Sequence, residues 1–137
     1  MSAARRIHWK LIVAAGFLSE VAVIALFFLL LLAATLAGVP EIARPMTPLD
    51  YVDALVASFV VVFLFTLWVG KRIDADFVLH GVLIGVVGIL LFCVMWRATA
   101  GSLLAQPALY VVAHALKVAG GIAGGLVAGT RKQRSAA

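Results

Sequence analysis

The stretch YVVAHALKVAGGIAGGLVAG, residues 110–129, decides how this chain folds. Wound as an α-helix at about 100° per residue, it separates into two faces. Bulky aliphatic residues lie on one face and small or polar residues on the other: Val111, Val112, Leu116, Ile122 and Leu126 on the first, and Tyr110, Ala113, His114, Lys117, Gly120, Gly121, Gly124 and Ala128 on the second. In a bilayer such a helix turns its bulky face to lipid and packs its small face against other helices.

The composition of the whole chain also indicates a membrane protein. Of its 137 residues 65% are hydrophobic and only 12% are charged. Apolar runs long enough to cross a bilayer occupy residues of about 11–36, 51–69, 76–96 and 107–129. Short connections between these runs favour neighbouring helices of opposite direction. We therefore expect one domain, residues 1–137, with an all-α fold: an antiparallel four-helix transmembrane bundle in contact with the lipid bilayer.

The positions of Lys and Arg predict the orientation of this bundle, because positive residues concentrate on the cytoplasmic side. Eight of the eleven lie in the N-terminal head, the loop between the second and third spans, and the C-terminal tail: Arg5, Arg6, Lys10, Lys71, Arg72, Arg131, Lys132 and Arg134. Arg44 and Arg97 lie in the other loops. We expect both termini in the cytoplasm, and the predicted location is a bacterial inner membrane. The net charge of +5 thus reflects topology, and we expect no nucleic-acid partner.

Two charged residues lie deep inside the predicted spans. Glu20 is ten residues past Lys10, and Lys117 is ten residues past Pro107 on a helix of opposite direction. Ten helical residues span about 15 Å, so both charges lie near the midplane. A lone charge there costs about 2.5–3.5 kcal/mol. We predict an intramembrane ion pair, which either locks the first helix to the last, forms a proton- or substrate-coupled site, or pairs with another subunit.

Two histidines are candidates for a ligand or a proton relay. His114 lies one turn before Lys117 on the same face, and His80 lies near the cytoplasmic end of the third span. Because they occupy opposite halves of the bilayer, they cannot both bind one haem within one subunit. The chain has no HxxxH or CxxC motif and a single cysteine, Cys93. We expect no metal, and haem or pigment binding through His114 or His80 remains a third hypothesis.

Glycines predict where the helices approach most closely. Residues with no side chain let two helix backbones come into contact. They recur on one face of the third span and at four-residue spacing in the last: Gly81, Gly85 and Gly88, and Gly120, Gly121, Gly124 and Gly125. This face contacts either the rest of the bundle or another protein.

Two parts of the chain are similar to known membrane proteins. WVGKRID, residues 68–74, followed by a glycine-spaced span to Leu90, resembles the last hairpin of small multidrug resistance transporters. The resemblance implies that Glu20 is similar to the essential glutamate of that family. In that family the matching span is the final one, whereas here a span with Lys117 follows, and we interpret the match as convergence. RxxxxFxxHG (72–81) and LKxxGGxxGG (116–125) resemble small four-span bacterial membrane proteins of unknown function, which implies no activity.

Besides haem or pigment binding, these features lead to two functional hypotheses. Since no nucleophile and base are paired in the sequence, we expect no enzymatic activity. The first hypothesis is an accessory or structural subunit of a larger bacterial membrane complex, which docks on other subunits through the small face of the last helix. The second is a small proton-coupled transporter that acts as a homodimer, with Glu20 as the coupling carboxylate and Lys117 and His114 along the path.

Overall fold

The structure is a computed structural model, and it describes residues 7–38, 51–98 and 107–136. The elements in these ranges are all helical, which confirms the predicted all-α fold. They are α1 (Trp9–Leu36), η1 (Asp53–Ala57), α3 (Ser58–Gly70), α4 (Phe77–Ala98) and α5 (Pro107–Ala136). Because η1 is a π-helical segment that continues directly into α3, residues 51–70 form one helical rod.

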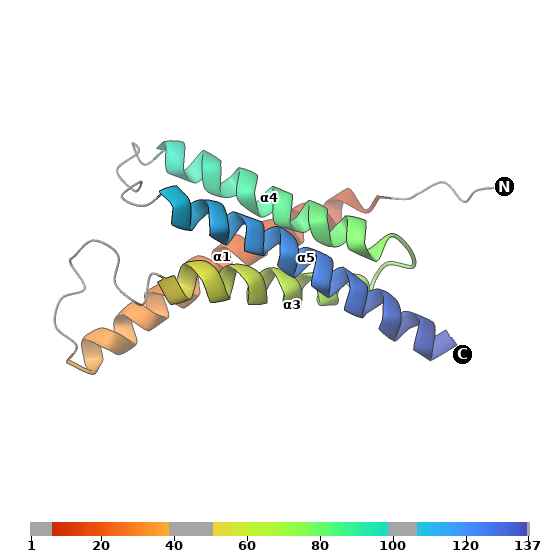
Figure 1. The fold of residues 1–137 in the computed structure, drawn as a ribbon, viewed down its shortest axis with the longest axis horizontal. Helices are drawn as coiled ribbons and strands as arrows, with labels where there is room; N and C mark the ends of the chain where they lie inside the picture. Colours follow the sequence, from red (N-terminus) through yellow and green to blue (C-terminus); the bar gives the residue numbers. More distant parts are fainter. Residues whose placement is uncertain (1–6, 39–50, 99–106, 137) are drawn as a thin grey trace.

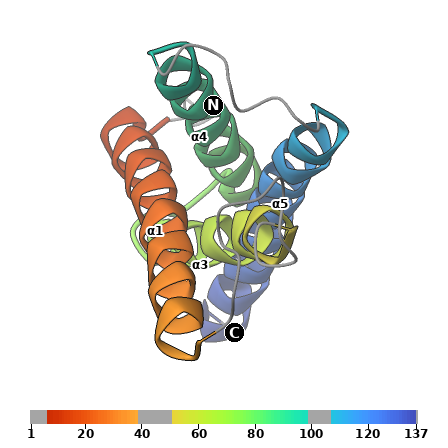
Figure 2. The ribbon, with the colours of Figure 1, turned by 90° about the vertical axis from the view of Figure 1, so that its left-hand side faces the viewer.

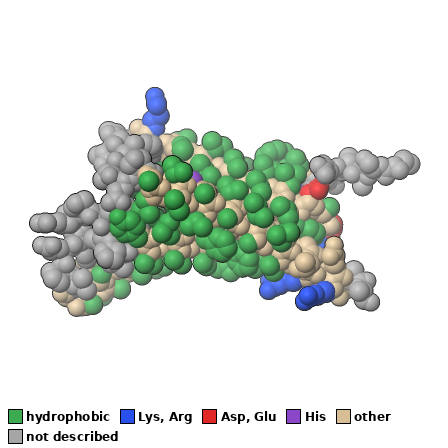
Figure 3. Space-filling model, viewed as in Figure 1, with side chains coloured by type: hydrophobic (Ala, Val, Ile, Leu, Met, Phe, Trp, Pro, Cys, Tyr) green, Lys and Arg blue, Asp and Glu red, His purple; other side chains and the backbone are tan. Residues whose placement is uncertain are grey.

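Among the described residues, three helices are long and apolar enough to cross a membrane: Trp9–Leu36, Phe77–Met95 and Ala108–Ser135. The second predicted span appears as a shorter apolar helix, Ala54–Gly70. Figure 3 shows hydrophobic side chains over the middle of the face in view, with Lys and Arg side chains toward the two ends. Apolar side chains facing outward in a continuous band are what a bilayer requires of the protein that it surrounds.

The last helix extends beyond the predicted span, residues 107–129. The α5 helix continues through the basic residues to Ala136. No proline follows Gly129, and Lys, Arg and Gln are good helix formers, so nothing in this stretch ends the helix. The basic tail is therefore an extension of α5 beyond the apolar part.

The helix α5 lies between α3 and α4, with which it makes the most extensive contacts (Figure 1). Its small face is buried and its bulky face is exposed, as the sequence predicts: Gly120, Gly121, Gly124, Gly125 and Ala128 are buried, whereas Val111, Val112, Ile122 and Leu126 are exposed. The remaining helix, α1, packs mainly against α4 and also touches α3.

Glycines allow the closest approach between α4 and α5. A Cβ atom added to Gly81 would collide with the carbonyl oxygen of Gly121, and one added to Gly121 would collide with that of Gly81. On the neighbouring side of α5, Gly120 and Gly124 lie against the backbone carbonyls of Phe59 and Phe63 in α3. The chain's own helices therefore fill the glycine face of α5.

The buried residues of α1 all lie in its first half. They are Ile12, Ala15, Gly16, Ser19 and Glu20, and no residue from Val21 to Leu36 is buried. The ribbon explains this difference, because the later turns of α1 lead away from the other helices (Figure 2). The apolar core lies toward the opposite end, where Ile12, Ile84, Val62, Val69 and Ile73 are almost fully buried.

Lys132 connects the extension of α5 to the turn between α3 and α4. Its Nζ donates hydrogen bonds to the carbonyl oxygen of Ile73 at 2.8 Å and to the Oδ1 of Asp74 at 2.5 Å. The hydrogen bond and the positive charge of Lys132 hold the pKa of the Asp74 carboxyl below its usual range. The same turn ends at Asp76, whose φ of +54° is unusual for a residue with a side chain.

We expect the attachment of α5 at this turn to depend on pH. Because the folded-state pKa of Asp74 is lowered, its contribution is complete above the ordinary aspartate range and is lost as the pH falls through the lowered pKa. Asp74→Asn should therefore speed hydrogen exchange in the last turns of α5 at about pH 7 but not at about pH 2. Arg131→Gln, which removes an exposed cation one residue away, is the control. An Asp74→Asn effect of equal size at both pH values would contradict this prediction.

Candidate functional site

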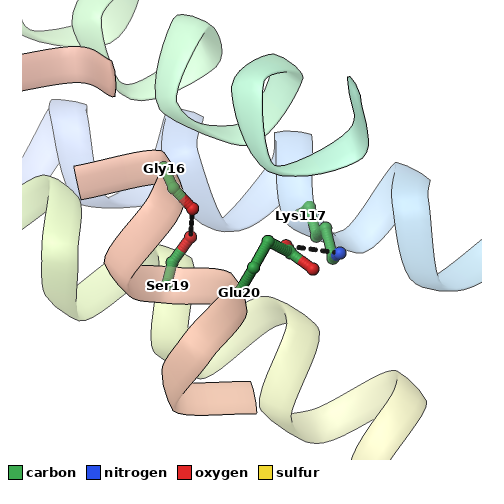
Figure 4. Close-up of polar contacts among 4 residues, drawn as sticks. All are labelled: Gly16, Ser19, Glu20 and Lys117. Atoms are coloured by element: carbon green, nitrogen blue, oxygen red, sulfur yellow. Dashed lines mark hydrogen bonds and ion pairs between the residues drawn. The ribbon is translucent and has the colours of Figure 1, made fainter. Parts of the chain in front are cut away.

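The structure brings Glu20 and Lys117 together between α1 and α5. The Nζ of Lys117 donates a hydrogen bond to the Oε1 of Glu20 at 2.6 Å. Both residues are almost completely buried, with exposures of 4% for Glu20 and 3% for Lys117. Figure 4 shows the two side chains pointing toward each other across the space between their helices. The pair is therefore a contact within one chain.

Glu20 reaches this position because the buried face of α1 carries small residues. Gly16 lies one turn earlier, where an added Cβ would be 2.6 Å from the Cγ1 of Val87 in α4. Ser19 is fully buried, and its Oγ donates a hydrogen bond to the carbonyl oxygen of Gly16 at 2.8 Å (Figure 4). The Ser19 hydroxyl thus has its hydrogen-bond partner within α1 and does not compete for the carboxylate of Glu20, which points at α5.

The three glycines predicted to share one face of α4 each make room for a different group. Gly81 faces the backbone of Gly121, as described above. Gly85 faces the backbone of Lys117, since an added Cβ would be 3.0 Å from its carbonyl oxygen. Gly88 faces the carboxylate, since an added Cβ would be 2.8 Å from the Oε1 of Glu20. This glycine face of α4 therefore admits both the backbone of α5 and the side chain of Glu20.

An aromatic cluster lies beside the ion pair. The Nζ of Lys117 is 5.4 Å from the centroid of the Phe92 ring, within the range of a cation–π contact. The same ring contacts His114 edge to face, with centroids 4.9 Å apart, and Tyr110 at 5.5 Å. Phe92 was not among the predicted site residues. As one of eight phenylalanines in an apolar chain, it carries no sequence signal that distinguishes it.

His114 is the polar residue of this cluster whose bonding is incomplete. Its Nδ1 is buried and has no hydrogen-bond partner among the residues that the structure describes. A buried ring nitrogen without a partner loses its hydration without compensation. His114 lies one turn from Lys117 on α5, and the ring of Phe92 contacts both residues.

His80 belongs to a different part of the molecule. It lies in the first turn of α4, is 1% exposed, and is hydrogen-bonded to the segment before α1 and to Asp76. The structure thus separates the two histidines that the sequence proposes as ligands. Within residues 7–38, 51–98 and 107–136, no three His, Cys, Asp or Glu side chains are grouped as metal ligands would be.

The chemistry open to the Glu20–Lys117 pair follows from its burial. Removing two charges from water is expensive, and their attraction offsets that cost only with short, well-directed contacts such as this one. The 2.6 Å contact between Nζ of Lys117 and Oε1 of Glu20 lets each charge offset the other inside the bundle. The arrangement suits a structural connection and, with His114 nearby, a proton relay.

Comparison of the chain with protein-family models, with curated proteins and with solved structures finds no match of any of the three kinds.

Proposed function

We propose that this protein is a non-enzymatic accessory or structural subunit of a larger bacterial membrane complex. The observation that carries the proposal is that the buried charged groups of the chain pair with each other. Glu20 and Lys117 neutralise each other across α1 and α5, and the glycines of α4 and α5 bring these helices into backbone contact. Such features stabilise a rigid bundle and leave an apolar outer surface for lipid and for neighbouring subunits.

The partner surface that we assign is the second half of α1, Val21–Leu36. The small face of α5, which the sequence suggests for docking, is occupied by α3 and α4. The second half of α1 has no buried residue, and its largest exposed side chains include Phe28 and Leu29, at 61% and 62% exposure. The exposed side chains of this half of α1 are therefore available to contact a neighbouring subunit in the membrane.

Gentle solubilisation of a tagged chain from its native membrane tests this proposal. We expect the chain to migrate in native gels well above its monomer mass of 14.5 kDa, after correction for detergent, and mass spectrometry to find the same partner subunits repeatedly. Phe28→Ala with Leu29→Ala should release the monomer. Val111→Ala with Leu126→Ala, which removes similarly exposed side chains from α5, should not. A wild-type chain that migrates alone as a monomer overturns the proposal.

We also propose that the bundle is antiparallel, with both termini in the cytoplasm of a bacterial inner membrane. The order of contacts supports opposite directions for α4 and α5, because Gly81 meets Gly121 whereas the later Gly85 meets the earlier Lys117. The bias of Lys and Arg toward the head, the 70–76 turn and the tail supports the orientation. A fluorescent protein fused after residue 137 should fluoresce, and alkaline phosphatase fused there should be inactive. The reverse result would refute the orientation.

A second candidate function, a proton-coupled transporter acting as a homodimer, is favoured by one specific observation. The Nδ1 of His114 lacks a hydrogen-bond partner among the described residues, one turn from the buried pair, which supports a proton path that would run through Glu20, Lys117 and His114. In liposomes with an imposed pH gradient, the wild-type protein should carry protons and Glu20→Gln should not. Equal proton flux for both proteins, or none with the wild type, would reject this function.

A further inference from the structure

His80 makes two hydrogen bonds that together define its protonation state. Its Nδ1 lies 2.9 Å from the carbonyl oxygen of Asp76, and its Nε2 lies 3.2 Å from the backbone nitrogen of His8. A carbonyl oxygen only accepts, so Nδ1 must carry a hydrogen. A backbone N–H only donates, so Nε2 must present its lone pair. The structure therefore requires the neutral imidazole with its hydrogen on Nδ1.

This requirement leads to a pH-sensitive contact. We propose that His80 is a latch that holds the segment before α1 on α4 while its ring is neutral and releases it when Nε2 is protonated. Protonation places an N–H on Nε2 directly opposite the backbone N–H of His8. Two donors that face each other repel and cannot form a hydrogen bond, so the bond between His80 and His8 is lost. The hydrogen bond from Nδ1 to Asp76 is unaffected, so the ring stays in place while its bond to His8 is lost.

The bond to His8 matters because His8 begins α1. The carbonyl oxygen of His8 accepts hydrogen bonds from the backbone of Leu11 and Ile12 at 2.9 and 3.1 Å. Ile12 belongs to the buried core. Release of His8 therefore frees the first turn of α1, which no side-chain cap holds. The latch thus makes the order of the N-terminal end of α1 depend on the pH at this end of the bundle.

Some charged residues near His80 favour the release of His8, and others oppose it. The ring of His8 lies 5.8 Å from that of His80, so protonation of both rings adds repulsion and favours release. The carboxylate of Asp74 attracts an imidazolium, but Lys132 already binds it. The titratable and charged residues of the segments around this end are His8 and Lys10 of the N-terminal segment and α1, Lys71, Arg72, Asp74 and Asp76 of the turn, and Arg131, Lys132 and Arg134 of α5.

Magnetic resonance of the full chain, labelled with ¹⁵N and reconstituted in nanodiscs, tests the latch. At about pH 8 the nitrogen shifts of His80 should show a bare Nε2 and a protonated Nδ1, the less common form of a neutral histidine. As the pH is lowered stepwise, the spectra should show the point at which Nε2 gains a proton. Over the same range the His8 amide should exchange about tenfold faster than expected from pH alone, because it loses its hydrogen bond.

Three variants separate the latch from other titrations. His80→Gln offers a carbonyl oxygen that does not titrate, so His8 should stay protected down to about pH 5. His8→Gln keeps the backbone donor and removes its ring, so the pH dependence should persist. His114→Gln, at the other end of the bundle, should behave as the wild type. A wild-type His80 with its hydrogen on Nε2 at high pH, or protection of His8 that does not follow the protonation of His80, overturns the proposal whatever the variants do.

Discussion

Lys117→Met is expected to destabilise the bundle by about 3–5 kcal/mol, because it leaves the carboxylate of Glu20 buried without its partner. Glu20 is 4% exposed, and its Oε1 receives the hydrogen bond of Lys117 at 2.6 Å. Methionine has nearly the length and volume of the lysine side chain, so the change removes the charge and adds little strain. Glu20→Met, which leaves the ammonium group unpaired, should cost a similar amount.

The double variant Glu20→Met with Lys117→Met is the test of this explanation. Because it removes both charges and keeps the volume, it should be within about 1 kcal/mol of the wild type, and the effects of the single changes should not add. Lys132→Met, which breaks the exposed pair with Asp74, should cost much less than Lys117→Met. Unfolding by SDS in mixed micelles, followed by circular dichroism, measures all four variants. Additive single effects would show that the two residues do not stabilise the bundle as a pair.

This series also distinguishes the two proposed functions. A subunit that uses the pair as a structural connection should keep its assembly in the double variant, where the bundle is stable but uncharged. A transporter that uses Glu20 as the coupling carboxylate should lose all proton flux in the same variant, however stable it is. Only if the protein is a transporter should the double variant keep its stability and lose its activity.

Gly121→Ala is expected to destabilise the bundle by about 3 kcal/mol through a collision of two backbones. The new Cβ would overlap the carbonyl oxygen of Gly81, which is part of a helix and cannot rotate away. Alanine is favoured over glycine in a helix by about 1 kcal/mol, so the collision must exceed this gain before any loss is measured. The helices α4 and α5 would have to separate, and this separation would also weaken the contacts that Gly85 and Gly125 make between the two helices.

Gly129→Ala is the matched control for Gly121→Ala. It is the same substitution in the same helix, but its Cβ would lie 3.3 Å from the Cδ2 of Phe77, the end of a side chain that can move. The propensity gain then dominates, and stability should stay equal or rise by up to about 1 kcal/mol. SDS unfolding curves measured side by side decide the result. If both variants lose the same stability, close backbone contact at Gly121 is not what holds α4 and α5 together.

Much of the candidate site is readable in the sequence, because the cost of a charge in lipid is a local property. Glu20 and Lys117 each interrupt an apolar run at similar depth, which predicts an ion pair but leaves open whether they pair with each other or with another subunit. Phe92 was not predicted, since an aromatic residue in an apolar span is unremarkable until its neighbours are known. The bond between His8 and His80 joins residues 72 positions apart, and no periodicity relates the segment before α1 to the first turn of α4.

The sequence by itself determined the all-helical fold and the face of α5 that packs against protein, because helical periodicity and the exclusion of polar groups from lipid act on each segment separately. It also placed the glycines of α4 on one face. Only the tertiary structure decided that α3 and α4 fill the glycine face of α5, and that α1 leaves the bundle after Glu20. Those outcomes depend on how the helices cross. The crossing of two helices depends on the surfaces of both, whereas the residue pattern of one helix describes only the surface of that helix.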